Sequence, residues 1–248
     1  MVNVIKDKIV LDEQPGVFET QAGRRHYLWS KRILDIVISS MLIVMLSPLL
    51  LLIGVAIKLT SKGPIFFSQA RVGGRLIKNG KHAYWQASTF HCYKFRTMYV
   101  NSDVSLHRDF FRAFVENDEV RMEAIQGRHT HVRKLVRDRR ITPVGGVLRK
   151  LSLDELPQFL NVLRGDMSIV GPRPAIPYEV EMYKPWHMKR FAVQSGITGL
   201  QQVTARSAKD FDTQVALDLE YIEKQSFCLD MQIILKTPLV ILSTRGAG

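Results

Sequence analysis

The sequence has few cysteines, no internal repeats, and only one long run without charged residues. Its two cysteines, Cys92 and Cys228, provide no disulfide framework, which agrees with a reducing, cytoplasmic setting. No low-complexity tract interrupts the 248 residues, a length that suits one globular domain and a membrane segment. The uncharged run begins too late, is too long, and lacks a small-residue cleavage site, so it is not a signal peptide.

Acidic residues are scarce relative to basic ones, with 23 Asp and Glu against 35 Lys and Arg. Such a surplus is typical of chains that contact nucleic acid, anionic lipid or a phosphorylated substrate. No nucleic-acid-binding signature accompanies it, so we expect no nucleic-acid partner. The stretch from Gly74 to Gly80 is not a P-loop, because it has one residue too many and Lys81 is followed by His82.

The uncharged run extends from Ile36 to Ile57 and has Ser47-Pro48 near its centre. About 22 residues at about 1.5 Å each span about 33 Å, enough to cross a hydrocarbon core of about 30 Å. Pro48 has no N–H for the carbonyl of Val44, so the helix should kink or break there. Ser47 can bond back to the carbonyl of Ile43, which also bends helices. Each half would then reach only the bilayer midplane.

Basic residues flank the run on both sides and bear on its topology. Because positive residues tend to stay in the cytoplasm, both ends look cytoplasmic, which a re-entrant hairpin satisfies and a single pass does not. A kinked spanning helix remains the alternative, since prolines are tolerated in such helices. We predict an N-terminal polar segment (1–30), a re-entrant membrane hairpin (31–60) and a cytoplasmic domain (61–248). The flanking cations are Arg24, Arg25, Lys31 and Arg32 before the run, and Lys58 and Lys62 after it.

The rest of the chain predicts a helix-rich α+β fold with short strands and interfacial amphipathic helices. Short strands are expected at 65–67 and 91–98, with a basic loop at 73–80 between them. The segment 227–242 is apolar but interrupted by charge and proline, and either lies in the head-group plane or is a buried core helix. Helices are also expected at 103–136, at 156–163 with Gly165 as the stop, and at 210–224.

Asp154 and Glu155 are the first candidates for chemistry. Ser152 and Glu155 match a capping box, whereas Pro157 sits better as the first residue of a helix that begins after the two acids. In either case a helix dipole faces the carboxylates and should keep them ionised. Ionised paired carboxylates suit metal binding or nucleophilic attack, and the further acid Asp166 is interpreted as structural.

Basic side chains form the second set of candidates. Strand alternation puts Lys94 and Arg96 on one face about 7 Å apart, where they either hold a diphosphate or face solvent at a sheet edge. Arg173 lies between two prolines in the segment 171–174, and such a preorganised guanidinium binds phosphate at little entropic cost. Arg139, followed by Arg140, is predicted to join the same basic pocket.

Taken in order, these segments resemble the bacterial sugar transferases, the monotopic phosphoglycosyl transferases that start exopolysaccharide synthesis. The resemblance covers the chain from about Lys31 to its C-terminus. Six ordered motifs carry it: Ser47-Pro48 in the hairpin, GPIFFSQ at 63–69, KFRTM at 94–98, LRKLSLDELPQ at 148–158, GDMS at 165–168 and GPRP at 171–174.

This resemblance implies a reaction in which a UDP-sugar gives its sugar-1-phosphate to polyprenyl (undecaprenyl) phosphate and UMP leaves. It implies Asp154 as the covalent nucleophile, with Asp154 and Glu155 holding Mg²⁺. Because two anionic substrates repel each other, a covalent intermediate lets each react in turn with the enzyme. Mg²⁺ and nearby cations would offset the diphosphate charge. The substrate-binding residues that follow are Lys94, Arg96, Arg139, Arg149 and Arg173.

The resemblance also implies that residues 61–248 are a catalytic domain at the cytoplasmic face of the bacterial inner membrane. Membrane lipid and downstream glycosyltransferases are then further partners. Roughly ten extra residues between Gly73 and Tyr93, and Gln201 where the family usually has Trp, leave the sugar open. The competing hypotheses are a membrane-anchored basic module that binds anionic lipid or RNA, and a spanning assembly protein.

Overall fold

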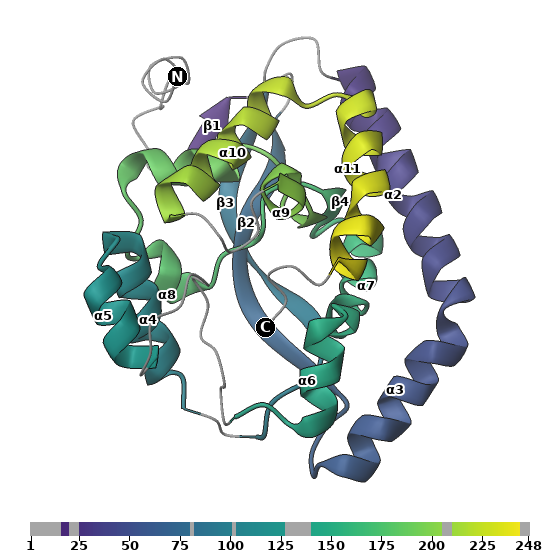
Figure 1. The fold of residues 1–248 in the computed structure, drawn as a ribbon. Helices are drawn as coiled ribbons and strands as arrows, with labels where there is room; N and C mark the ends of the chain where they lie inside the picture. The colour runs from purple at the N-terminus through teal and green to yellow at the C-terminus, as the bar shows by residue number, and fades with distance from the viewer. Residues whose placement is uncertain are drawn as a thin grey trace.

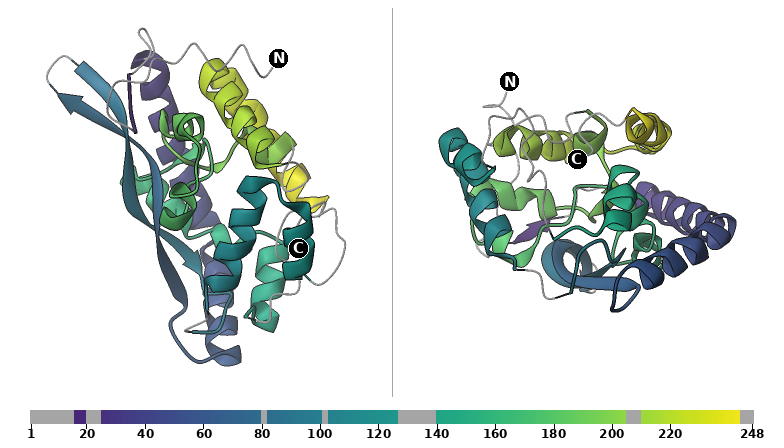
Figure 2. Two further views of the ribbon diagram at one scale, coloured as in Figure 1. Left: turned by 90° about the vertical axis from the view of Figure 1, so that its left-hand side faces the viewer. Right: turned by 60° about the horizontal axis from the view of Figure 1, so that its bottom comes forward.

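A long antiparallel hairpin runs along one side of the molecule, and most helices lie on its other side (Figures 1 and 2). The computed structural model describes residues 16–19, 25–79, 82–100, 103–126, 140–204 and 210–243. Strands β2 (Phe66–Asn79) and β3 (His82–Phe95) pair along their whole length, from Phe66 with Phe95 to Asn79 with His82. Strand β1 (Val17–Glu19) pairs antiparallel with the other edge of β3.

The hairpin is much longer than the sequence predicted, and the expected loop at 73–80 is wrong because residues 73–79 continue β2. The glycines that suggested a loop instead allow β2 to lie close to another part of the backbone. A Cβ atom on Gly74 would overlap the backbone carbonyl oxygens of Phe191 and Val193. The extra residues lengthen the hairpin, and Trp85 among them is buried where β1 pairs with β3.

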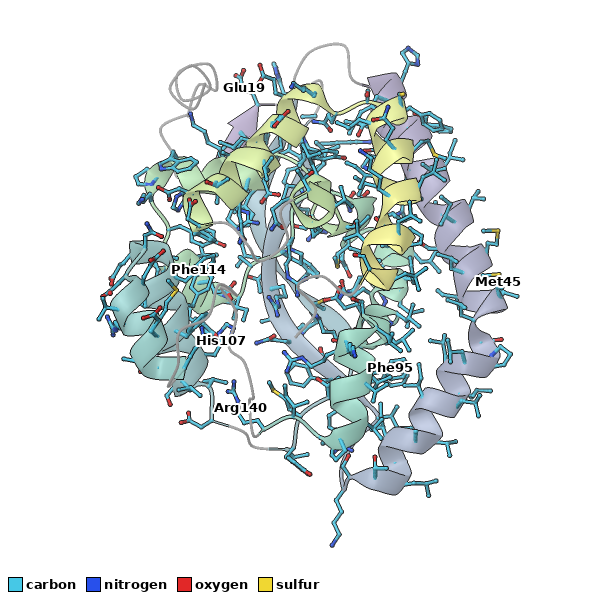
Figure 3. The ribbon with its side chains drawn as sticks, in the orientation of Figure 1. Glu19, Met45, Phe95, His107, Phe114 and Arg140 are labelled. Carbon is cyan, nitrogen blue, oxygen red and sulfur yellow. The ribbon has the colours of Figure 1, made fainter. Side chains whose placement is uncertain are left out.

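The apolar run forms two helices that meet at a bend of 62° (Figure 1). Helix α2 spans Arg25–Met45 and α3 spans Ser47–Thr60, with Met45 at the bend (Figure 3). The predicted break is confirmed, although Ser47 Oγ donates to the carbonyl of Val44 at 2.8 Å rather than to Ile43. Among the described helices none alone is long and apolar enough to cross a membrane, whereas this bent pair together meets that test by length and composition.

The remaining elements lie on the inner side of the hairpin, and some of them contact it directly while others pack on neighbouring helices (Figures 1 and 2). Helices at 210–224 and before Gly165 are confirmed, and Gly165 ends its helix with a φ of 84°. The single helix predicted over 103–136 is wrong, because Asn117 adopts a left-handed φ of 58° and ends the first of two helices; residues 127–139 lie outside the described residues. The helices are α4 (Ser105–Glu116), α5 (Glu119–Gln126), α6 (Pro143–Lys150), α7 (Gln158–Arg164), α8 (Pro177–Val180), α9 (Leu200–Thr204), α10 (Phe211–Lys224), α11 (Phe227–Leu242) and the 3₁₀ turns η1 (Leu153–Glu155) and η2 (Pro185–Phe191).

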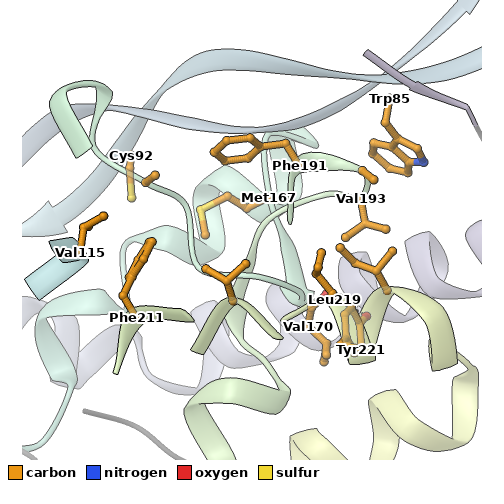
Figure 4. Close-up of a cluster of buried hydrophobic side chains, with 14 of the residues drawn as sticks. Trp85, Cys92, Val115, Met167, Val170, Phe191, Val193, Phe211, Leu219 and Tyr221 are labelled. Carbon is orange, nitrogen blue, oxygen red and sulfur yellow. Dashed lines mark hydrogen bonds between the residues drawn. The ribbon is translucent and has the colours of Figure 1, made fainter. Parts of the chain in front are cut away.

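Two apolar clusters hold these elements together. The larger lies between the hairpin, the short parallel pair β4 (Ser168–Val170) and β5 (Gly196–Thr198), and α10 (Figure 4). The smaller joins α3 to Phe95, α6 and η1 through Ile53, Ile57 and Leu148. The second half of the apolar helix pair therefore packs directly against the turn that carries the two candidate acids.

Helix α11 is not the buried core helix that one interpretation of 227–242 required. Only Asp230 and Ile233 are buried along it, while Leu235, Leu239 and Leu242 are exposed. Within the predicted N-terminal polar segment (1–30), residues 17–19 form β1 and α2 begins at Arg25.

Candidate active site

The two candidate acids lie on η1, a short turn between α6 and α7. Ser152 enters this turn with a left-handed φ of 56° and makes no capping hydrogen bond with its side chain, so the predicted capping box does not form. Pro157 immediately precedes the first residue of α7, close to the alternative prediction. Leu153 and Leu156 pack into the smaller apolar cluster, on either side of the acids.

Glu155 is held by two cations from different elements. Lys94 Nζ, near the end of β3, lies 2.6 Å from Glu155 Oε1. Arg173 Nη2 donates to the same oxygen at 3.1 Å. Lys94 also lies 4.0 Å from Asp154 Oδ2, so one lysine faces both carboxylates. The structure therefore brings together four of the residues predicted from the sequence.

Burial and nearby charges shift the pKa values of Asp154 and Glu155 in opposite directions. Burial raises the pKa of Asp154, and the nearby charge of Lys94 only partly opposes this. Burial also acts to raise the pKa of Glu155, but the charges of Lys94 and Arg173 outweigh it and hold that pKa well below its usual range. The two adjacent acids therefore differ, since the pKa of Asp154 is raised and that of Glu155 is lowered.

Three other predicted residues take different places. Arg149 is exposed on the last turn of α6, and its charge acts to lower the pKa of Asp154. Arg96 follows the end of β3, and its guanidinium donates to the carbonyl oxygens of Ser61 and Lys62 rather than to Asp154 or Glu155. Arg139 lies outside the described residues.

The further acid, Asp166, follows the end of α7. Its Oδ2 accepts from Asn161 Nδ2 at 3.3 Å, and Asn161 in turn contacts the β3 backbone at His91 and Tyr93. These contacts agree with the structural role predicted for Asp166.

Sequence reasoning missed Arg71, which lines a small cavity together with Cys92, Lys94, Gln158 and Arg173. The cavity has a volume of about 10 Å³ and lies beside Glu155's two cations. The signal that could have found Arg71 is strand alternation along β2. Recognising it requires knowing that β2 continues past residue 67 and pairs with the strand that carries Lys94.

The acids present agree with the donor set that Mg²⁺ prefers. No group of three or more His, Cys, Asp and Glu side chains that could form a closed metal cage occurs in the described part of the chain. Mg²⁺, however, is usually held by one or two carboxylates together with substrate phosphates and water. Asp154 and Glu155, adjacent on η1, supply two such carboxylates.

Carboxylates opposed by cations on rigid elements, beside a bent apolar helix pair, define a class of transferases that handle phosphate esters. Comparison with known proteins identifies the family. The family model for bacterial sugar transferases matches residues 26–244, and the chain therefore belongs to this family, as its motifs predicted. It is accordingly a phosphoglycosyl transferase.

Among similar proteins, the chain is 39% identical over 218 residues to the exopolysaccharide production protein ExoY of Sinorhizobium fredii, covering 88% of each chain. It is 36% identical to the undecaprenyl-phosphate galactose phosphotransferase of Salmonella typhimurium, over 92% of this chain and 44% of that one. It is 38% identical to the UDP-glucose:undecaprenyl-phosphate glucose-1-phosphate transferase of Escherichia coli, over 84% of this chain and 39% of that one. The chain thus spans less than half of these last two relatives.

Proposed function

We propose that this protein transfers a sugar-1-phosphate from a UDP-sugar to undecaprenyl phosphate and releases UMP, as the first membrane step of exopolysaccharide synthesis. The observation that carries the proposal is the cluster of Asp154, Glu155, Lys94 and Arg173 in a member of this family. The names of the relatives support undecaprenyl phosphate as the acceptor and, for one of them, UDP-glucose as the donor.

Asp154 is the nucleophile in this proposal. A carboxylate oxygen of Asp154 attacks the sugar-linked phosphorus, the bond from that phosphorus to the bridging oxygen breaks, and UMP leaves with the electron pair. An oxygen of the acceptor phosphate then attacks the same phosphorus and displaces the Asp154 carboxylate, which restores the enzyme. Each anionic substrate therefore reacts with the enzyme and never directly with the other.

Glu155 is less suited to attack because its charge is engaged. Its Oε1 accepts from both Lys94 and Arg173, and the resulting low pKa marks a weak nucleophile. Asp154 has a raised pKa, and its one ion pair within the described part of the chain is the 4.0 Å contact with Lys94. With Mg²⁺ bound, Asp154 and Glu155 would hold the ion, which supplies positive charge against the diphosphate. Lys94, Arg149 and Arg173 offset the remaining charge.

The bent helix pair supports a location of this site near the membrane surface. We propose that α2 and α3 form a re-entrant hairpin entered from the cytoplasmic side of the inner membrane. Basic residues flank the pair at both ends, which favours a common side for those ends. Because α3 packs against η1, the acids lie close to where the hairpin leaves the bilayer and where a lipid phosphate would be.

The test is transfer of labelled sugar-1-phosphate from a panel of UDP-sugars to undecaprenyl phosphate. Asp154→Asn should abolish transfer, and EDTA should do the same. Without acceptor, the intact mass of the wild-type protein should increase by one sugar phosphate, located on Asp154, and that of Asp154→Asn should not. Asp166→Asn is the matched control, because Asp166 is hydrogen-bonded to Asn161 away from the cluster, and it should keep transferring. Full activity of a folded Asp154→Asn protein would refute the proposed function.

A further inference from the structure

Arg71 stands out among the cations near the site because it forms no ion pair with an acid in the described part of the chain. It lies on β2 opposite Phe90, two positions from the pair of Gln69 with Cys92 and four from the pair of Phe67 with Lys94. These positions share one face of the hairpin, since side chains alternate along a strand. The Arg71 guanidinium therefore points to the same side as Lys94.

Neutral groups hold this guanidinium in place. Arg71 Nη1 donates to the backbone carbonyl of Pro174 at 3.3 Å, and Nη2 donates to Gln69 Oε1 at 3.0 Å. Pro174 belongs to the segment that also carries Arg173, so both guanidinium groups are tied to the same rigid loop. Arg71, Lys94 and Arg173 line one cavity.

The charge of Arg71 has no counter-ion among the residues that the structure describes. Within the described residues no carboxylate oxygen lies within 4.0 Å of it, whereas Lys94 and Arg173 both contact Glu155, and the buried Arg190 contacts Asp218 at 2.6 Å. Burial lowers the pKa of Arg71, while the opposing effect of Glu179 is smaller. A partly buried cation without a counter-ion is costly, and its retention indicates that the missing anion is a ligand.

We propose that Arg71 binds a phosphate oxygen of the donor's diphosphate, an inference that rests on the proposed function. A guanidinium has five N–H donors in a planar fork that matches phosphate, and the described contacts involve only Nη1 and Nη2. Arg71, Lys94 and Arg173 together present three positive charges, and the contacts of Glu155 reach only the last two. The diphosphate supplies the remaining negative charge.

The size of the cavity shows how the diphosphate would enter. Its volume of about 10 Å³ is comparable to one water molecule and too small for a phosphate. Binding of the diphosphate therefore requires that the Arg173 side chain, which is 47% exposed, move away from Glu155 and widen the cavity toward solvent. Arg71 stays in place, because its guanidinium is hydrogen-bonded to the carbonyl of Pro174 and to the side chain of Gln69.

The experiment is calorimetric binding of UDP and of uridine to the full-length protein in nanodiscs, comparing wild type with Arg71→Gln. Loss of a charge-assisted contact should weaken UDP binding roughly 10- to 100-fold. Uridine lacks phosphate, so its affinity should change less than about twofold. Arg75→Gln is the matched control, because Arg75 lies on the same strand and face but is exposed, and it should bind both ligands like the wild type.

Arg71→Lys provides a second variant that keeps the charge but loses the planar fork, and its UDP affinity should lie between those of wild type and Arg71→Gln. Wild-type UDP affinity in Arg71→Gln, or in Arg71→Lys if the glutamine variant does not fold, overturns the inference and leaves the proposed function standing. A wild-type protein that binds no UDP overturns it as well. If the wild-type protein binds UDP through Arg71 but transfers no sugar phosphate, the proposed function is refuted and the inferred anion-binding site at Arg71 still stands.

Discussion

Asp154 and Glu155 are consecutive in the sequence, yet only Glu155 accepts hydrogen bonds from Lys94 and Arg173. The difference arises because these cations come from β3 and from the loop after β4, which approach η1 from the side of Glu155. Residue type alone gives two similar acids; the fold gives one that is neutralised and one that is buried with a raised pKa. At this scale, reactivity follows from which neighbours reach which oxygen.

His187 allows the effect of burial on a single residue to be measured. Its side chain is fully buried between Trp186 and Phe211, with Nε2 2.9 Å from Asp212 Oδ1. Burial lowers its pKa from 6.5 to about 4, against the opposing effect of Asp212. Between these values the unfolded chain binds more protons than the folded one, so stability should fall as the pH is lowered from 6.5 to 4.

This loss should total on the order of 3 kcal/mol, because each unit of pKa shift corresponds to about 1.4 kcal/mol. The measurement is the urea unfolding free energy in one detergent from pH 7.5 to 4.5, for wild type and His187→Gln. Carboxylates other than its partner Asp212 contribute equally to both proteins, so the difference between the two pH profiles reports on His187 and this contact. Parallel profiles would show that His187 does not stay neutral in the folded protein.

At the scale of elements, alanine substitutions at two glycines distinguish the effect of close packing on stability from the effect of backbone conformational freedom. Gly74 on β2 lies against the carbonyl oxygens of Phe191 and Val193, so Gly74→Ala must push β2 away from η2. We expect a loss of roughly 2 kcal/mol in unfolding free energy. Gly146 lies within α6 and an added Cβ would meet no atom within 4 Å, so Gly146→Ala should stabilise by roughly 0.5–1 kcal/mol. Equal effects in urea unfolding would contradict this account of β2.

The bend between α2 and α3 should determine topology. Pro48→Ala restores a backbone donor and should let the two helices join into one helix long enough to span a bilayer. The measurement is labelling by a membrane-impermeant maleimide in intact cells, with Lys62→Cys introduced and the two native cysteines replaced. Position 62 should be protected when Pro48 is present and labelled in Pro48→Ala.

Val55→Ala, at an exposed position on α3, is the control for this experiment and should stay protected. Labelling of position 62 with Pro48 intact would refute the re-entrant topology. Protection in Pro48→Ala would show that features other than the proline maintain the bend.

Elements whose signals are local could be predicted from the sequence, and those that depend on partners could not. The break at Ser47-Pro48, the end of α7 at Gly165 and helix α10 follow from proline, glycine and periodicity. Residues 73–79 were expected as a loop because glycine is rare in strands, and only the contact with η2 explains why glycine is needed there. Arg96 was predicted beside Lys94 from alternation, and the structure shows that its guanidinium instead bonds the backbone of Ser61 and Lys62, a partner that the local pattern does not reveal.

At the scale of the whole molecule, a buried polar network joins the first and last helices of the described chain. Lys31 on α2 donates to Asp230 on α11 at 2.9 Å and to the hydroxyl of Tyr221 on α10 at 3.2 Å. Tyr221 in turn donates to Asp230 at 2.8 Å. Asp35, one turn along α2, accepts from the backbone N–H of Ile169 on β4. The first half of α2 is therefore tied to the core of the protein. In the proposed topology these contacts would fix the orientation of the site relative to the bilayer.

This network should behave as one unit when it is mutated. Lys31→Met leaves the Asp230 carboxylate buried without its cation and should cost roughly 3–5 kcal/mol of unfolding free energy, measured by urea unfolding in detergent. Lys31→Met combined with Asp230→Leu removes both charges and should recover most of that loss. The exposed pair of Lys224 with Glu220 on α10 is the control, and Lys224→Met should change stability very little. Additive losses in the double variant would show that Lys31 and Asp230 stabilise the protein independently, and α2 would then be held to the core mainly by apolar packing and by contacts such as that of Asp35.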